Sequence, residues 1–218
     1  KQKAFIQKIK HTLPTHSENL LHSIVQQEDN IIYYALEGTV NGAGSAFTWF
    51  AETYKIDNWQ ENATKWLTES HDPPLFLNGI GGVGSPHWQP QFSSCFLTEA
   101  NIAEKFTAVV ESVVFLIADN INELNREGEP STTAVITGGG AKIDGLCQRL
   151  ADVSALNVMR PVASEATAGG LAFLLAGMPH SWPQPSSKTT FLPRENTSVQ
   201  QRYHRWQHAM KKALRNGN

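Results

Sequence analysis

The sequence predicts an α/β domain in which a mixed sheet is flanked by helices, and three observations support this. Strand-like runs come first, helix and strand patterns then alternate, and glycine-rich turns stand at the ends of predicted strands. This order of elements is typical of a sheet covered by helices. The chain has 218 residues, of which 40% are hydrophobic and 17% charged, enough for one sizeable domain or two small ones.

The first forty residues indicate a small antiparallel unit. Residues 4–9, 20–25 and 31–37 carry the short apolar runs of strands. Gly42 and Gly44 then open a helix whose apolar stripe is spaced by four, three and four residues: Ala43, Phe47, Phe50 and Tyr54.

The middle of the chain predicts two helices and a strand. A short helix is expected over residues 58–69 and a strand over residues 75–80. The longest helix is expected to begin with Thr98 as its N-cap and to end at Gly128. Its apolar residues recur every three or four positions, as in a core helix: Ile102, Phe106, Val109, Val113, Ile117, Ile121 and Leu124.

The most informative segment is a predicted strand followed by three glycines and a helix. The β-branched run 132–137 predicts a short buried strand, and the helix begins at Asp144 after Gly138, Gly139 and Gly140. Glycines remove every Cβ atom near the helix N-terminus, so a flat or anionic ligand can reach unpaired N–H groups. The segment favours a nucleotide or phosphate site, and a tight turn with spare glycines is the alternative.

Two common glycine fingerprints do not fit this segment. The dinucleotide pattern requires a glycine at the position of Ile143, and the Walker pattern requires Ser or Thr after Lys142. The sequence therefore supports neither a Rossmann enzyme nor a P-loop NTPase.

The last third of the chain predicts a strand at 158–160 and a core helix from Ser164 to Gly177. Residues 181–198 are rich in Pro, Ser and Thr, which indicates a linker or a surface strap. A terminal helix over residues 200–214 carries one apolar stripe: Tyr203, Trp206, Met210 and Ala213. Its basic residues are predicted to form a solvated face rather than a nucleic-acid contact: Arg202, Arg205, Lys211, Lys212 and Arg215.

Composition limits the possible partners and compartment. The formal net charge of −2 argues against broad binding to nucleic acid or membrane, and no apolar run approaches the roughly 20 residues of a membrane span. The only cysteines, Cys95 and Cys147, lie far apart, which fits a reducing cytoplasm. His204 and His208 stand one helical turn apart but lack a third metal ligand, so no metal site is predicted. A chain that opens within a strand and without Met is expected to be part of a longer protein.

Four segments together resemble the FGGY family of carbohydrate kinases, in the family's order and at roughly its spacing. They are residues 34–49, with Ala-Leu-Glu-Gly and Ala-Gly-Ser-Ala; residues 84–90, Gly-Ser-Pro-His-Trp-Gln-Pro; residues 138–142, Gly-Gly-Gly-Ala-Lys; and residues 165–169, Glu-Ala-Thr-Ala-Gly. The chain differs from the family pattern at Gln89, where the family has Asp, and at Ser93 and Ser94, where it has Arg-Gly.

The resemblance implies the fold of an actin-like ATPase (ribonuclease H-like) domain. Residues 1–178 would be the C-terminal ATP-binding domain, incomplete at its N-terminus, and residues 179–218 a surface strap and a terminal amphipathic helix. It implies ATP and Mg²⁺ as cofactors, and a small sugar or polyol and the kinase's own N-terminal domain as partners. Homodimerisation stays open. The catalytic Asp and most sugar contacts would lie outside this chain, which is expected to be inactive alone.

The resemblance also implies which residues contact the nucleotide: Gly44, Thr48, Gly139, Gly140 and Asp144. Gly44 could instead serve helix packing, and Asp144 could be a helix N-cap. Two other functions remain: a non-catalytic nucleotide-binding or regulatory module, and an oxidoreductase, which the failed dinucleotide pattern disfavours.

Overall fold

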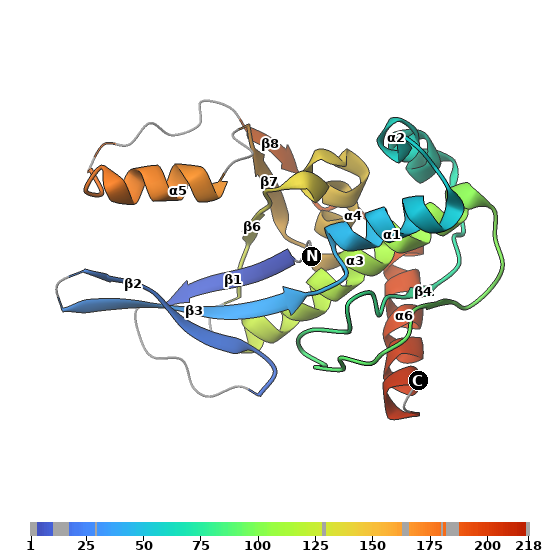
Figure 1. Ribbon diagram of the computed structural model, residues 1–218, viewed down its shortest axis with the longest axis horizontal. Coiled ribbons are helices and arrows are strands. Elements are labelled where there is room, and N and C mark those ends of the chain that lie inside the picture. Colours follow the sequence, from blue (N-terminus) through green and yellow to red (C-terminus); the bar gives the residue numbers. More distant parts are fainter. Residues whose placement is uncertain are drawn as a thin grey trace.

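The computed structural model describes residues 4–10, 18–28, 30–127, 130–162, 166–179, 181 and 188–216. Within these residues, two three-stranded sheets and a short hairpin surround one long helix, α3 (Ile102–Arg126) (Figure 1). The mixed α/β architecture that the sequence predicts is confirmed.

The N-terminal sheet is the predicted antiparallel unit. It contains β1 (Ala4–Lys10), β2 (Leu21–Glu28) and β3 (Ile31–Val40) in the order β1-β3-β2. The central strand β3 buries Ala35, Leu36 and Val40, because it lies against α3.

Helix α1 (Gly44–Tyr54) follows β3 and has the predicted apolar stripe. Phe47 and Phe50 are buried, and their rings lie 6.3 and 5.4 Å from the ring of Phe106 on α3. Helix α2 (Trp59–Glu69) packs beside it, with the Trp59 ring 5.3 Å from Phe47. These aromatic contacts fix the position of α1.

Helix α3 does not begin where the sequence predicts. The N-cap is Asn101 rather than Thr98, because Asn101 and Glu104 form a capping box. The Asn101 side chain accepts from the Glu104 N–H at 3.0 Å, and Glu104 accepts from the Asn101 N–H at 3.2 Å. Two unpaired donors of the first turn are thereby satisfied.

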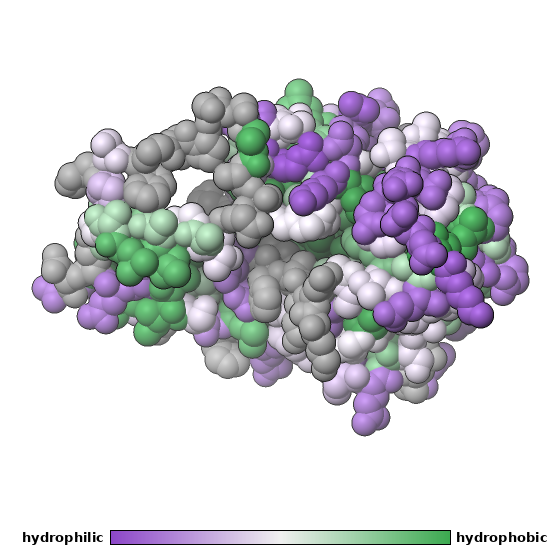
Figure 2. Space-filling view, turned by 45° about the horizontal axis from the view of Figure 1, so that its top comes forward, coloured by the Kyte–Doolittle hydropathy of each residue, from purple (hydrophilic) through white to green (hydrophobic). Residues whose placement is uncertain are grey.

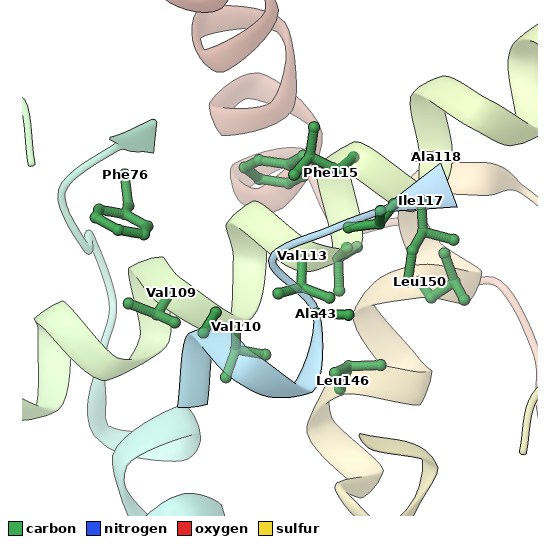
Figure 3. Close-up of a cluster of buried hydrophobic side chains, with 14 of the residues drawn as sticks. Ala43, Phe76, Val109, Val110, Val113, Phe115, Ile117, Ala118, Leu146 and Leu150 are labelled. Carbon is green, nitrogen blue, oxygen red and sulfur yellow. The ribbon is translucent and has the colours of Figure 1, made fainter. Parts of the chain in front are cut away.

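The core forms around α3. Sixteen of its 25 residues are buried, and its apolar side chains meet Ala43, Phe76, Leu146 and Leu150 from the surrounding elements (Figure 3). Helix α4 (Asp144–Ser154) supplies the last two of these. Each fully buried Leu or Phe side chain contributes about 1.5–3 kcal/mol, so this cluster dominates the stability of the fold.

The second sheet has the order β6-β7-β8: β6 (Thr133–Val135), β7 (Asn157–Pro161) and β8 (Lys188–Phe191). Strands β6 and β7 are parallel and are connected through α4, whereas β8 is antiparallel to β7. Strand β8 lies in the segment predicted as a linker or strap. Its pairing with β7 was not visible in the sequence.

Two elements predicted to be buried are exposed. Thr133 and Val135 of β6 are exposed, because only one edge of this strand is paired with a described strand. Helix α5 (Ala166–Leu175) has no buried residue, although it was predicted as a core helix. The predicted start at Ser164 lies outside the described residues.

Strands β4 (Phe76–Leu77) and β5 (Cys95–Phe96) form a two-stranded sheet. The backbone of the loop that connects them packs closely against its neighbours. A Cβ atom at Gly84 would collide with the Thr39 carbonyl, and one at Gly38 would collide with the Asn120 side chain. The Asn120 Nδ2 atom donates to the Ser85 carbonyl at 2.9 Å and the Ser85 hydroxyl to Asn120 Oδ1 at 2.7 Å. This network holds the loop and β3 against α3.

The terminal helix α6 (Thr197–Arg215) docks on the core through its predicted apolar stripe, with Tyr203, Trp206 and Met210 buried. Arg202, predicted on the solvated face, is only 4% exposed. Its Nε and Nη2 atoms donate to Glu111 Oε2 and Oε1 at 2.8 and 2.6 Å. The buried Glu111 carboxylate attracts this guanidinium into the core.

Arg149 of α4 completes this buried ionic cluster. Its Nε donates to Glu111 Oε1 at 3.2 Å and its Nη2 to the Leu67 carbonyl at 2.9 Å. One carboxylate therefore ties α4 and α6 to α3. Within the described ranges, no helix is both long and apolar enough to span a bilayer.

Replacing Glu111 by Gln is expected to lower the free energy of unfolding by about 3–5 kcal/mol, because two guanidinium groups would stay buried without their carboxylate. The measurement is urea unfolding followed by circular dichroism. The matched control is Glu99→Gln, whose side chain is 94% exposed and pairs with Lys105. That change is expected to cost about 0–1 kcal/mol. Equal losses in both variants would contradict the anchoring role of Glu111.

Candidate nucleotide-binding site

The glycine turn after β6 has two parts. Gly138 has φ of +88°, in the left-handed region that favours glycine. A single 3₁₀ turn, η1 (Gly139–Lys142), follows and is closed by bonds from the Ala141 N–H to the Gly138 carbonyl and from the Ile143 N–H to the Gly140 carbonyl, at 3.2 and 3.1 Å. Helix α4 begins immediately afterwards.

The next two glycines face open space. A Cβ atom at Gly139 would meet no heavy atom within 4 Å, and one at Gly140 would meet only Leu146 and Phe47 side-chain atoms, at 3.9 and 4.0 Å. Packing within the described residues therefore does not require glycine at either position. The tight-turn alternative explains Gly138 through its φ angle but explains neither Gly139 nor Gly140.

The bare turn opens onto a cavity of about 1720 Å³. Gly44 and Thr48 of α1 line this cavity together with Gly139 and Gly140, so two segments almost a hundred residues apart meet there. The turns at Gly44 and Gly140 therefore lie on the same side of the molecule. The other residues that line this region include Ala43, Phe47, Trp59, Gln60, Ala63 and Thr64.

The glycine-rich turn at residues 82–84 lies outside this cavity. Gly82 and Gly84 do not line the cavity, and a Cβ at either position would collide with backbone atoms of Pro90 or Thr39. These two glycines serve the close packing of the loop. The repeated glycines in the sequence could not distinguish close packing from ligand contact.

Asp144 stands apart from the other four predicted site residues. It is the first residue of α4 and does not line the large cavity. Its side chain makes no capping bond, so the N-cap alternative is wrong; instead its Oδ1 accepts from Arg160 Nη1 at 2.7 Å. The Asp144 side chain is 70% exposed, which leaves its second oxygen accessible.

Arg160 is a candidate site residue that the sequence did not indicate. Besides its bond to Asp144, its Nη1 donates to the Ala141 carbonyl at 2.7 Å, and its guanidinium lies 5.3 Å from the centre of the Phe191 ring. Arg160 also lines a second cavity of about 410 Å³, with Gly138 and Lys142. Its place at the end of a predicted strand was the only signal in the sequence.

A buried side chain of α4 also binds the glycine turn. Cys147 is fully buried, and its thiol donates to the Ala141 carbonyl at 3.3 Å. Burial raises the pKa of Cys147 to about 11. The thiol is therefore protonated at neutral pH and acts as a donor, not as a nucleophile.

Comparison with known proteins gives the family of this fold. The model of the FGGY family of carbohydrate kinases, C-terminal domain, matches residues 6–178. Glycerol kinase 2 of Saccharolobus solfataricus is 30% identical over 220 residues, which cover 92% of this chain and 43% of that protein. The glycerol kinase of Haloferax volcanii is 27% identical over 202 residues, which cover 87% of this chain and 39% of that protein.

Solved structures match at the level of the fold. A glycerol kinase from Plasmodium falciparum, solved with ADP, superposes with a TM-score of 0.81 at 18% identity, over 96% of this chain and 45% of that one. A ligand-bound xylulose kinase from Lactobacillus acidophilus gives a TM-score of 0.76 at 18% identity, over 98% and 45% of the two chains. The chain thus spans less than half the length of these relatives.

The fold of this chain is therefore that of an actin-like ATPase domain, as predicted. The chain belongs to the FGGY family of carbohydrate kinases and corresponds to the C-terminal domain of that family.

Cys147 is expected to resist alkylation by iodoacetamide at neutral pH in the native protein, because its thiol is buried and its pKa is raised from 9.0 to about 11. The neutral thiol contributes its full stability below about pH 9, and this contribution falls as the pH rises toward 11. Mass spectrometry of labelled peptides measures the rate, with Cys95, which is half-buried, as the internal comparison. Rapid labelling of Cys147 before Cys95 would contradict the support of the turn by this thiol.

Proposed function

We propose that this chain is the ATP-binding half of a sugar or polyol kinase that transfers the γ-phosphoryl group of ATP to a carbohydrate hydroxyl. The observation that carries the proposal is the pair Gly139 and Gly140, whose missing side chains leave free space on the wall of a large cavity. Glycine at such positions costs conformational entropy, and a ligand that must approach the backbone closely accounts for that cost.

Two parts of the structure would contact the nucleotide: the glycine turn before α4, and helix α1. The backbone at Gly139 and Gly140 offers a flat surface to the adenosine. The exposed Thr48 hydroxyl, on α1 in the lining of the same cavity, can donate to ribose or phosphate. Gly44 opens α1, a helix of 11 residues whose first N–H groups favour a negative charge.

Asp144 would contact the edge of the nucleotide base through its free oxygen. Its other oxygen is fixed by Arg160, which also binds the carbonyl of Ala141 in the glycine turn. Arg160 therefore orients both parts of the base-binding region. The solved relative with ADP supports a nucleotide in this class of domain.

The chemistry of transfer requires groups beyond this chain. Phosphoryl transfer depends on positioning and on neutralisation of charge, part of which Mg²⁺ would supply when ATP is bound. Among the described residues, no three His, Cys, Asp or Glu side chains gather in a way that could hold a metal ion. The rest of the kinase would supply the general base and most sugar contacts.

A non-catalytic nucleotide-binding module is the second candidate. It is favoured by Ser93 and Ser94, which replace the Arg-Gly of the family pattern. In the structure Ser94 has a packing role, since its hydroxyl accepts from the Gly79 N–H at 2.9 Å. Catalytic activity separates the two candidates.

Gly140→Val is expected to abolish ATP binding, because a Cβ atom and two methyl groups would occupy the space intended for adenosine. The fold should be retained, since the nearest protein atoms to the added Cβ lie 3.9 and 4.0 Å away. Isothermal titration calorimetry of the complete protein measures binding, and its thermal unfolding measures the fold.

The matched control is Thr68→Val on α2, an isosteric change at an exposed position that does not line the cavity. This variant should bind ATP like the unmodified protein. Normal ATP binding by Gly140→Val would remove the glycine turn from the site.

The activity itself is tested by a coupled assay of ADP release. The complete protein, supplied with Mg-ATP, is screened against pentuloses, hexuloses, glycerol and other polyols. ADP release that depends on one acceptor is expected, whereas the 218-residue chain alone should show no turnover. ATP binding without turnover on any acceptor would favour the non-catalytic module.

A further inference from the structure

A smaller cavity lies beside the glycine turn, next to strands β7 and β8. Its volume is about 410 Å³, and pockets for small ligands usually measure about 300–1,000 Å³. Arg160 and Thr189 line this cavity but not the larger one, whereas Gly139 and Gly140 line only the larger one. The glycine turn therefore borders two cavities with different linings.

Arg160 gives the smaller cavity a positive charge and unused donors. Its Nη1 atom donates to the Ala141 carbonyl and to Asp144 Oδ1, both at 2.7 Å. No hydrogen bond joins its Nε or Nη2 atom to another described residue. Since Arg160 lines the cavity and only 23% of its side chain is exposed, these two nitrogen atoms can donate to a ligand that enters the cavity.

Lys142 supplies a second cation to the same cavity. It ends the 3₁₀ turn, its side chain is exposed, and its ammonium group forms no ion pair with a described acidic residue. Neither Asp nor Glu is found among the described residues that line the cavity. The lining therefore carries two positive charges and no negative one, and Asp144 offsets part of the charge of Arg160 from outside it.

Two threonine hydroxyls accompany the cations. Thr189 lies directly opposite Arg160 in the pairing of β8 with β7, and residues that are directly opposite share a face of the sheet. Thr137 follows Ile136, whose N–H donates to the Met159 carbonyl at 2.9 Å and holds the end of β6 beside β7. Both threonines line the cavity and are exposed, and neither hydroxyl is bonded to a described residue.

The apolar part of the lining is small. It includes Ile136, Pro161 and Val162, and Val162 is 69% exposed. The larger hydrophobic surface of the molecule lies elsewhere: Figure 2 shows the hydrophobic residues of α5 (green) gathered at one end, and no residue of α5 lines this cavity. The cavity therefore suits a ligand that is mainly polar and carries a short carbon body.

The donors favour a phosphate monoester over a carboxylate. A phosphate monoester carries close to two negative charges at neutral pH, and its three terminal oxygens are strong acceptors. A planar guanidinium can bind two of these oxygens at once, while an ammonium group and hydroxyls bind the third. A carboxylate offers two oxygens and a single charge, so it would leave one cation of this cluster unpaired.

We propose that this cavity binds a small phosphate monoester at a site separate from the nucleotide cavity. The phosphate group contacts Arg160 and Lys142, together with the hydroxyls of Thr137 and Thr189, and the carbon atoms of the ligand contact Val162. The guanidinium is already in place, because its bonds to Ala141 and Asp144 and the Phe191 ring 5.3 Å away restrict its rotation. Such preorganised donors bind an anion at a lower entropic cost. The proposal does not require that the larger cavity binds ATP.

The site is linked to the candidate base site through Arg160. A dianion at its Nε and Nη2 atoms draws on the positive charge that serves the Ala141 carbonyl and the Asp144 carboxylate. It also adds negative charge beside the glycine turn. Both effects make the ester and ATP weaken each other's binding, by the same factor because coupling between two sites is reciprocal. This consequence, unlike the binding of the ester itself, rests on the proposed function.

Isothermal titration calorimetry of the complete protein without nucleotide tests the proposal, with ethyl phosphate as the probe. Thr189 lines only the smaller cavity, so Thr189→Val assigns the binding to that cavity. This change keeps the shape of the side chain, removes its hydroxyl and should weaken the binding of ethyl phosphate about fivefold. Lys142→Gln removes a charged donor and should weaken it at least about tenfold. The matched control is Lys211→Gln on the exposed face of α6, which should leave the affinity unchanged.

The proposal is overturned if the unmodified protein does not bind ethyl phosphate, if either cavity variant binds it with unchanged affinity, or if Lys211→Gln loses as much affinity as Lys142→Gln. Acetate that binds as tightly as ethyl phosphate would exclude the phosphate class, and inorganic phosphate that binds more tightly would identify the free ion as the ligand. Both results would overturn the ester. Should Lys142→Gln fail to fold, Thr189→Val decides.

These titrations contain no ATP, so their failure leaves the proposed function untouched. The coupling is measured by repeating the titration of ethyl phosphate with ATP present. Unchanged affinity for ethyl phosphate in the presence of bound ATP would contradict the link through Arg160 and leave the ester site in place.

Discussion

The burial of helix α3 is the constraint on which the other elements depend. It is enclosed by β3, α1, α2, α4 and β4, so each of these elements takes its position from the same surface. The helix is not purely apolar, because Glu111, Ser112 and Asn120 are buried within it. Each of these polar groups has a partner outside α3, either on α6 or in the loop between β4 and β5, and this partner is thereby held in place. Helix α1 and the start of α4 form two walls of the candidate site, and their packing on α3 sets the distance between them.

The ionic cluster at Glu111 makes the C-terminal helix α6 part of the core of the domain. The family model matches residues 6–178, yet α6 contributes Val199, Trp206 and Met210 to the same core as α3. The Trp206 indole N–H donates to the Phe76 carbonyl at 2.9 Å, which satisfies a polar group deep in the core. A buried carboxylate is costly without its cations. Any truncation that removes α6 would leave Glu111 with Arg149 alone and would open the surface around Phe115.

The sequence was sufficient for those parts of the fold that depend on local periodicity. The stripe of α1, the length of α3 and the strand–glycine–helix order needed only spacing of apolar residues and glycines. The parts that it did not predict depend on partners far away in the chain. Arg202 is buried only because Glu111 faces it, and the Asp144 side chain turns to Arg160 instead of capping α4. The open edge of β6 could not be predicted either, since β-branched residues are equally typical of central strands. Within the site, Gly139 could be distinguished from Gly84 only when the neighbours of each were known.

The contact between Gly38 and Asn120 has a consequence for the evolution of this domain. A side chain at position 38 would occupy the volume of the Asn120 amide, and that amide in turn holds Ser85. A larger residue at position 38 alone would collide with Asn120. A change of Asn120 alone would leave the buried polar groups of Ser85 without their hydrogen-bond partner. Across the lineage of this domain, substitutions at these two sites should therefore be inherited as a pair, with a smaller residue at 120 accompanying any larger one at 38. The two positions amount to one unit of sequence variation, although more than eighty residues separate them along the chain.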